Sequence, residues 1–172
     1  RMSDRFYETL KKLPKDMVQF EIGLQSINPQ TLKAIQRHND LERIKEHSQM
    51  IKELGTIHQH IDLIAGLPYE DFESFKESFN YLYTFKIEKI QLGFLKMLKG
   101  SLVRSQSDIF RYEFTDYAPY EVLKNDFLST DEIIILKKID YVVDKIYNEG
   151  SFKRTLDILE RVYLSPFAMF ED

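Results

Sequence analysis

Polar residues at every second position of one short segment are the part of this sequence best suited to ligand chemistry. Residues 18–26 alternate two sets of residues, the apolar Val18, Phe20, Ile22 and Leu24 and the set Gln19, Glu21, Gly23 and Gln25. Alternation with period two indicates a β-strand with two different faces. If the fold covers both faces, the polar groups must hydrogen-bond one another or a ligand, because an unpaired polar group is costly to bury.

Two later segments repeat this design. One side of residues 58–66 carries His58, His60, Asp62, Ile64 and Gly66, and one side of residues 89–95 carries Lys89, Gln91, Gly93 and Leu95. The active sites of parallel β/α barrels lie at the C-terminal ends of the strands. Gln25, Asp62 and Gly66 are near such ends. Glycine there lets a flat ligand approach the backbone. Polar groups that satisfy one another in a wet barrel centre would explain one such strand equally well, but three strands together favour a binding site.

A metal site is the alternative that this pattern leaves open. His58, His60 and Asp62 are two residues apart, so on a strand they share a face, and their side chains suit zinc or iron. A small metal-dependent hydrolase would use these three residues. Two histidines without a third firm ligand are weak evidence, and His58 lies near the strand start, so no metal ligand is assigned.

The elements expected to hold these residues alternate between strand and helix. The spacing predicts strands over 17–25, 56–65 and 89–95, and helices over 3–13, from Pro29, over 41–54 and over 71–84. Asn28 before Pro29, and Gly55 after the third helix, are typical helix-end signals. Strands separated by helices of 10–15 residues are the pattern of parallel βαβ units.

The character of the sequence changes near Gly100, so we expect two parts, residues 1–100 and residues 101–172. In the second part, residues 111–114 and 120–123 predict short aromatic strands that form a hairpin. Ser129-Thr-Asp-Glu132 predicts the start of a long helix that runs to about Asn148. A final helix is expected over 152–164. We expect this mostly helical extension to pack as a cap on the α/β part.

Composition narrows the class of protein. The 172 residues carry a net charge of −4 and 43% hydrophobic residues, which argues against a nucleic-acid face and is sufficient for a sizeable core. No apolar run approaches a membrane span, and no signal peptide is seen, so a cytoplasmic protein without a membrane partner is expected. The chain has no cysteine. It therefore offers no thiol nucleophile and no thiolate-held zinc or iron–sulfur cluster.

Taken together, the motifs resemble a known family. Glu21-x-Gly-x-Gln25-Ser26, Arg37 and Asp62-Leu-Ile-Ala-Gly-Leu-Pro68-x-Glu70 resemble the second half of the radical S-adenosylmethionine (radical SAM) core, closest to branches with coproporphyrinogen dehydrogenase and the methylthiotransferases. The general resemblance covers residues 17–95. The tail, with Leu98-Lys-Gly-Ser101 and Pro119-Tyr-Glu-Val-Leu123, is more narrowly similar to uncharacterised cobalamin-binding radical SAM proteins.

The resemblance implies a fold and a role for each matching residue. The fold would be α/β, a partial (β/α)6 TIM-like barrel with parallel strands four to six and the helical extension. Gln25 would hydrogen-bond the ribose, Arg37 would pair with the methionine carboxylate, and Asp62 would bind ribose hydroxyls. Ile64 through Gly66 would lie against the adenine, and Gly93 and Phe94 would complete its pocket. Glu21 faces the same interior and would hold substrate or cofactor.

The absence of cysteine departs from the family, which holds a [4Fe–4S] cluster on three cysteines after its first strand. We therefore expect this chain to be a C-terminal piece of a larger enzyme. The missing N-terminal half would be its partner and would supply the cluster, a Cys-x3-Cys-x2-Cys motif and a cobalamin domain. The piece alone is expected to be inert and to bind no cofactor tightly. A non-catalytic scaffold module, dimerising through an exposed sheet edge, remains a further alternative.

Overall fold

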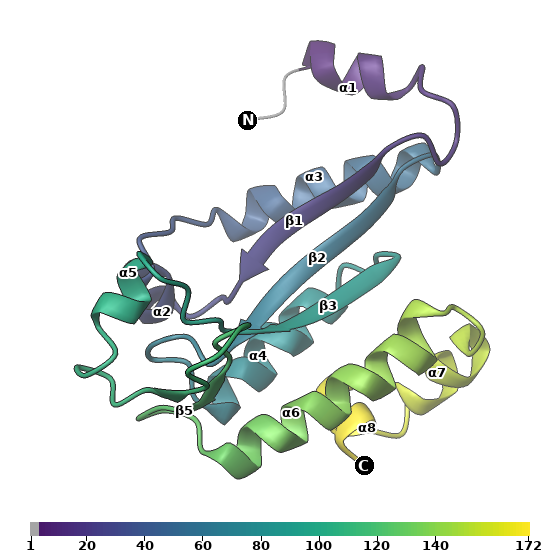
Figure 1. The fold of residues 1–172 in the computed structure, drawn as a ribbon. Coiled ribbons are helices and arrows are strands. Elements are labelled where there is room, and N and C mark those ends of the chain that lie inside the picture. The colour runs from purple at the N-terminus through teal and green to yellow at the C-terminus, as the bar shows by residue number, and fades with distance from the viewer. Residues whose placement is uncertain (1–3) are drawn as a thin grey trace.

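A three-stranded parallel sheet forms the centre of the computed structural model, which describes residues 4–172. Its strands are β1 (Gln19–Gln25), β2 (His58–Ala65) and β3 (Lys89–Phe94), and they lie side by side in that order (Figure 1). Both pairs are parallel. The predicted βαβ arrangement is therefore confirmed.

Helices precede and connect the strands where local signals place them: α1 (Asp4–Leu10), α2 (Pro29–Ala34), α3 (Leu41–Leu54) and α4 (Phe72–Tyr83). The side chains of Asn28, Asp40 and Asp71 accept backbone N–H groups at the starts of α2, α3 and α4. Gly55 ends α3 with a φ of 65°. Helix α1 is shorter than predicted, and Ser3 lies outside the described residues.

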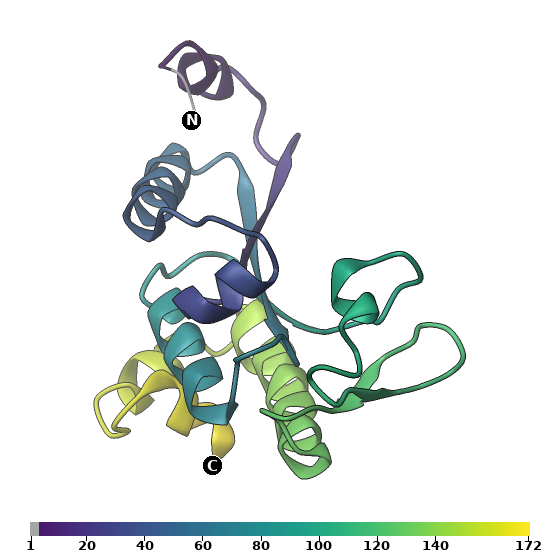
Figure 2. The ribbon, with the colours of Figure 1, turned by 90° about the vertical axis from the view of Figure 1, so that its left-hand side faces the viewer.

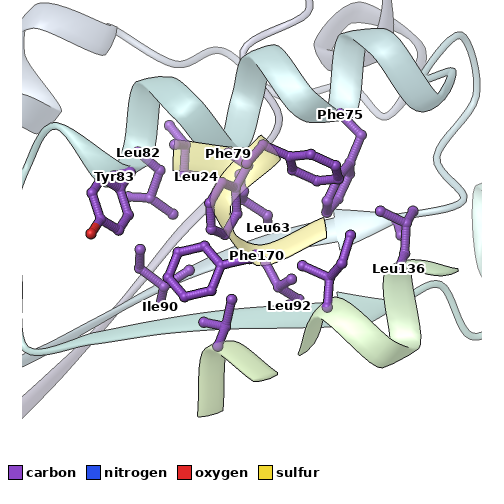
Figure 3. Packing of buried hydrophobic residues seen from close by; sticks show 14 of the residues in the cluster. Leu24, Leu63, Phe75, Phe79, Leu82, Tyr83, Ile90, Leu92, Leu136 and Phe170 are labelled. Atoms are coloured by element: carbon purple, nitrogen blue, oxygen red, sulfur yellow. The ribbon is translucent and has the colours of Figure 1, made fainter. Parts of the chain in front are cut away.

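The two faces of the sheet have different coverings. Figure 2 shows α2, α3 and α4 on one side of the sheet and α5 (Leu102–Ser105) with the hairpin on the other. On the helical side, the strand residues Leu63, Ile90 and Leu92 pack with Phe79 of α4 and Phe170 of the last helix (Figure 3). Since alternate residues point to opposite faces, the polar series of each strand lies on the other side of the sheet.

The C-terminal extension joins the same core. It contains β4 (Glu113–Phe114) and β5 (Val122–Lys124), then α6 (Thr130–Val142), a π-helix η1 (Val143–Asn148), α7 (Lys153–Leu159) and α8 (Pro166–Glu171). Strands β4 and β5 pair antiparallel, which confirms the predicted hairpin, and Ser129 with Glu132 forms a capping box. No helix within residues 4–172 is long and apolar enough to cross a membrane.

The predicted helix over residues 152–164 is wrong in its length. Helix α7 ends at Leu159, and Leu164 is fully exposed in the segment that follows. A separate helix, α8, starts after Ser165 and turns back onto α4, where Phe167 stacks edge-on against Phe79 at 5.6 Å between ring centroids. The cap on the α/β part is therefore confirmed, but a second short helix contributes much of it.

Side chains from the extension occupy the free edge of β3. The Asn148 amide accepts a hydrogen bond from the Ile90 N–H at 3.0 Å and donates one to the Ile90 carbonyl at 2.9 Å, as a neighbouring strand would. Asp140 of α6 accepts a hydrogen bond from the backbone of Leu92, two residues after Ile90 on β3. Burial raises the pKa of the Asp140 carboxyl, and Asp144 adds to this rise. Unpaired strand edges invite association, so these contacts close one edge of the sheet.

We expect Asn148→Ala to lower the free energy of unfolding by about 1–3 kcal/mol, because two backbone groups of Ile90 lose their partner. Urea unfolding followed by circular dichroism measures this. The control is Lys145→Ala, which removes an exposed ion pair with Glu149 from the same helix and should leave the stability close to that of the wild type. Equal stability of Asn148→Ala and the wild type would show that this amide does not hold the edge.

Candidate functional site

The polar residues of the three strands form rows across the side of the sheet that faces away from α2, α3 and α4. Gly23, Asp62 and Gln91 are partners in the parallel register and form one row. Glu21, His60 and Lys89 form a second row, two residues closer to the start of each strand. Partners in register lie on the same face, since neighbouring strands are about 4.8 Å apart and pleat together. The structure therefore brings Glu21 and Asp62 together, as the sequence predicts.

Gln25 and Arg37 meet at the end of β1. A Cβ atom at Gly23 would overlap the Gln25 amide and would lie 3.2 Å from the Arg37 guanidinium. The guanidinium Nη1 also donates a hydrogen bond of 3.2 Å to the Gly23 carbonyl. Gln25 adopts a left-handed conformation with a φ of 68° at a break in the strand register. Glycine at 23 therefore makes room for both predicted ligand-binding side chains beside Asp62.

The charges in the row of Glu21, His60 and Lys89 shift the pKa values of Asp62 and His60. Burial raises the pKa of Asp62, and the nearby Glu21 adds to this, while His60 opposes it. Burial lowers the pKa of His60, as does Lys89. The Nδ1 of the His60 ring lies 3.2 Å from the Nε2 of the Gln19 amide. This arrangement offers hydrogen-bonding groups of several kinds to a polar ligand.

The end of β2 supplies an apolar and partly enclosed region beside these polar residues. Ile64 pairs in register with Gly93, and its Cγ1 would lie 3.6 Å from a Cβ at that glycine. Gly66 follows with a φ of 90°, a conformation that favours glycine. Phe94 follows Gly93 on β3, but its ring belongs to the packing around the main core, with the Lys137 ammonium 5.4 Å from the ring centroid. The structure thus brings together the predicted site residues, except that the Phe94 ring packs toward α6.

A buried carboxyl group fixes the loop that follows β1. Glu70 is completely buried, and accepts hydrogen bonds from the Ser26 hydroxyl and, at 3.0 Å, from the Ser78 hydroxyl. Those hydroxyls in turn accept the backbone N–H groups of Asn28 at 2.8 Å and Ile27 at 3.1 Å. Burial raises the pKa of Glu70, and the two serine hydrogen bonds oppose that rise. The network joins the turn after β2 to the loop after Gln25.

Ser78 is a functional neighbour that the sequence reasoning missed. It lies on α4 between Phe75 and Phe79, on the face of the helix that is buried against the sheet. A polar residue on an otherwise apolar helical face is the signal that would have pointed to a buried partner. That partner is Glu70, the last residue of the motif that begins at Asp62, but the sequence does not show that Ser78 and Glu70 are in contact.

The three residues of the metal alternative do not converge. The His58 Nε2 lies 2.8 Å from a carboxylate oxygen of Asp16, whereas His60 contacts Gln19. Across residues 4–172, no three histidine, aspartate or glutamate side chains are grouped so that they would hold a metal ion. No observation thus favours the hydrolase alternative.

Comparisons with known families fit this geometry. Residues 1–82 match a family model described as the Radical SAM superfamily. Residues 108–172 match a second model, described as a protein of unknown function (DUF4080). The first match includes β1, β2 and the Glu70 loop, and the second includes the hairpin and the helices from α6 to α8.

Individual proteins give the same result. Over 152 residues, or 88% of the chain, the sequence is 28% identical to ribosomal protein uS12 methylthiotransferase RimO of Campylobacter fetus. The chain spans 30% of that relative's length. Among solved structures, coproporphyrinogen III oxidase (HemN) from Escherichia coli, described as a radical SAM enzyme, matches with a TM-score of 0.53 and 17% identity. That match covers 74% of this chain and 27% of the other, and at this identity it shows a shared fold.

We expect Glu70→Gln to lower the free energy of unfolding by about 1–3 kcal/mol, because the amide places two N–H hydrogens beside one of the two serine hydroxyls, where the carboxyl group places at most one. Chemical unfolding over a pH series measures it. As a control, Glu73→Gln changes an exposed carboxylate three residues away, in the first turn of α4, and should cost less than about 0.5 kcal/mol.

The pH dependence of this difference has a definite sign. Because burial raises the folded-state pKa of Glu70, the folded protein binds the proton more tightly than the unfolded chain. The stability that wild-type Glu70 contributes is full below its unfolded pKa and falls as the pH rises through the folded value. The gap between wild type and Glu70→Gln should therefore narrow as the pH rises. A gap that widens would contradict a raised pKa.

Proposed function

We propose that this chain, which belongs to the radical SAM superfamily, provides the part of the barrel that binds S-adenosylmethionine. The observation that carries the proposal is the convergence of Gln25, Arg37 and Asp62 on one face of a parallel sheet, at the C-terminal half of its strands. Ligands of such folds bind beyond the carboxyl ends of the strands. Strands β1 to β3 would be strands four to six of a partial (β/α)6 barrel.

The donor set suits the ligand group by group. Asp62, a half-buried carboxylate on the side of the sheet opposite α3 and α4, can accept hydrogen bonds from two adjacent ribose hydroxyls. The Arg37 guanidinium is exposed and presents a planar fork that suits the carboxylate of the methionine part. Gln25 lies beside it and offers both a donor and an acceptor to the ribose.

The flat part of the ligand has a matching surface. Ile64 offers an apolar, half-buried side chain, and the half-buried Gly93 beside it carries no side chain that would lie over a planar ring. Gly66 is buried against Val122 and Leu95, so its contribution is the shape of the turn. We propose that adenine lies there, with the backbone of Gly93 and Phe94 at its edge. Glu21 lies two residues before Gly23, in the row of His60 and Lys89. It would then face the substrate rather than the nucleoside.

The [4Fe–4S] cluster that the family implies does not fit this chain. Such clusters are held by cysteine thiolates, and these 172 residues contain no cysteine. We propose that other residues of the full-length protein hold the cluster, and that reductive cleavage of S-adenosylmethionine to a 5′-deoxyadenosyl radical is an activity of that whole protein. Cobalamin, which only the narrower resemblance implies, stays a prediction.

The partner proposed for the missing strands is the N-terminal half of the same protein. Within residues 4–172, no strand pairs with the outer edge of β1, whereas Asn148 occupies the outer edge of β3. A further parallel strand would therefore join at β1. Dimerisation through that edge remains the prediction of the scaffold alternative.

We expect Asp62→Asn in the full-length protein, with its cluster reconstituted, to weaken binding of S-adenosylmethionine by about 10- to 100-fold, because a charge-assisted hydrogen-bond acceptor is lost. Isothermal titration calorimetry measures the Kd. The control Asp157→Asn removes an exposed carboxylate from α7 and should leave the Kd unchanged.

A second measurement tests the activity itself. The wild-type full-length protein should form 5′-deoxyadenosine from S-adenosylmethionine when a strong reductant is added, and Asp62→Asn should form it at a reduced rate. A cluster-loaded wild type that never forms 5′-deoxyadenosine would contradict the proposed activity.

A further inference from the structure

The carbonyl group of Gly66 is the meeting point of the C-terminal extension and the sheet. It accepts a hydrogen bond of 2.8 Å from the Tyr112 hydroxyl and one of 3.0 Å from the Asn125 side-chain amide. Both donors come from the extension, 46 and 59 residues further along the chain. Tyr112 is buried, so its hydroxyl is dedicated to this contact rather than shared with solvent.

The same segment holds the turn after Gly66 through its aromatic rings. Tyr69, which has a φ of 63°, stacks edge-on against Phe110 at 5.4 Å and lies 5.0 Å from Phe127 between ring centroids. From the other side, the Asn28 amide donates a hydrogen bond of 2.8 Å to the Tyr69 carbonyl. Residues 66–70 are therefore held between the sheet and the extension.

Backbone hydrogen bonds also join the extension to the residue that follows β3. The Leu95 N–H donates to the Ala65 carbonyl at 2.9 Å, and the Val122 N–H donates to the Leu95 carbonyl at 3.0 Å. Val122 also packs directly against the turn, since its Cγ1 would lie 3.5 Å from a Cβ at Gly66. Three kinds of contact thus converge on one short turn.

We propose that residues 108–128 act as a clamp that positions the nucleoside-binding turn, with Tyr112 and Asn125 as the positioning residues. This inference rests on the proposed function, because the ligand that the turn would bind is the adenosine part of S-adenosylmethionine. It gives a role to the start of the region matched by the model of unknown function.

The physical reason is the unusual backbone of the turn. Gly66 has a φ of 90°, a conformation that favours glycine, and glycine loses more conformational freedom on ordering than any other residue. Without the two donors, its buried carbonyl would seek other partners and the turn would populate other conformations. The apparent affinity of a ligand falls in proportion to the fraction of protein in the binding conformation.

Two matched double variants separate positioning from general stability. In Tyr112→Phe/Asn125→Asp, the introduced carboxylate can still accept the N–H groups of Phe127 and Leu128, as the Asn125 side-chain oxygen does, but both donors to Gly66 are lost. The control Tyr147→Phe/Asn148→Asp removes the same two donor types from the carbonyls of Ile87 and Ile90. Both variants therefore weaken the docking of the extension onto the sheet, but only the first acts at Gly66.

The experiment uses the full-length protein with its cluster reconstituted. Calorimetric titration with S-adenosylmethionine gives the Kd, and thermal unfolding gives the Tm of each variant. We expect both double variants to have a lower Tm. Only Tyr112→Phe/Asn125→Asp should raise the Kd, by roughly 3- to 10-fold, the range of one ordinary hydrogen bond.

Each other outcome has a distinct meaning. If the two double variants raise the Kd equally, or if Tyr112→Phe/Asn125→Asp leaves it within twofold of wild type, the clamp is overturned while S-adenosylmethionine binding stands. If the wild type itself does not bind S-adenosylmethionine, the proposed function fails and the clamp falls with it.

Discussion

The separation of the two faces of the sheet is the constraint on which the rest of the molecule depends. Ile61 and Leu63 have no exposed surface because α4 and α8 cover their face. A shift of one residue in the pairing of β2 would move these side chains out and carry Asp62 into the core. Burial of the apolar series therefore fixes the register, and the register aligns Gly23, Asp62 and Gln91 into one row. The stability of the fold and the geometry of the site have the same origin.

The C-terminal extension is part of this arrangement rather than a neighbour of it. Phe167 and Phe170 of α8 contact Phe79 edge-on, and residues of both parts share the main hydrophobic cluster. Near the start of β3, Asn148 replaces a neighbouring strand. At the C-terminal end of β2, the extension reaches the turn at Gly66. One segment thus completes the sheet at its edge and contacts it where a nucleoside is proposed to bind.

Local patterns predicted much of the fold, because they record local physics. Period-two alternation gave the three strands, and the cap residue Asn28 and the αL residue Gly55 gave the helix ends. Alternation placed Gly23 and Asp62 on one face, but the amide of Gln25 reaches that face through a register break and a left-handed backbone that local spacing does not show. The boundary between α7 and α8 was missed, although Ser165-Pro166 is a helix-start signal, because the apolar spacing of residues 152–164 suggested one helix. The contacts of Ser78 with Glu70 and of Tyr112 with Gly66 join distant segments, and nothing in local spacing shows which buried polar groups will meet.

The central claim is that the polar face of the sheet, at its C-terminal end, receives S-adenosylmethionine. Hydrogen–deuterium exchange of the full-length, cluster-loaded protein with and without this ligand tests the claim most directly. We predict slower exchange in residues 23–37, 62–70 and 91–95, and no change in α7 or in the segment after it. Protection confined to the helices of the extension, or no ligand-dependent protection in the three strand-end segments, would contradict the account.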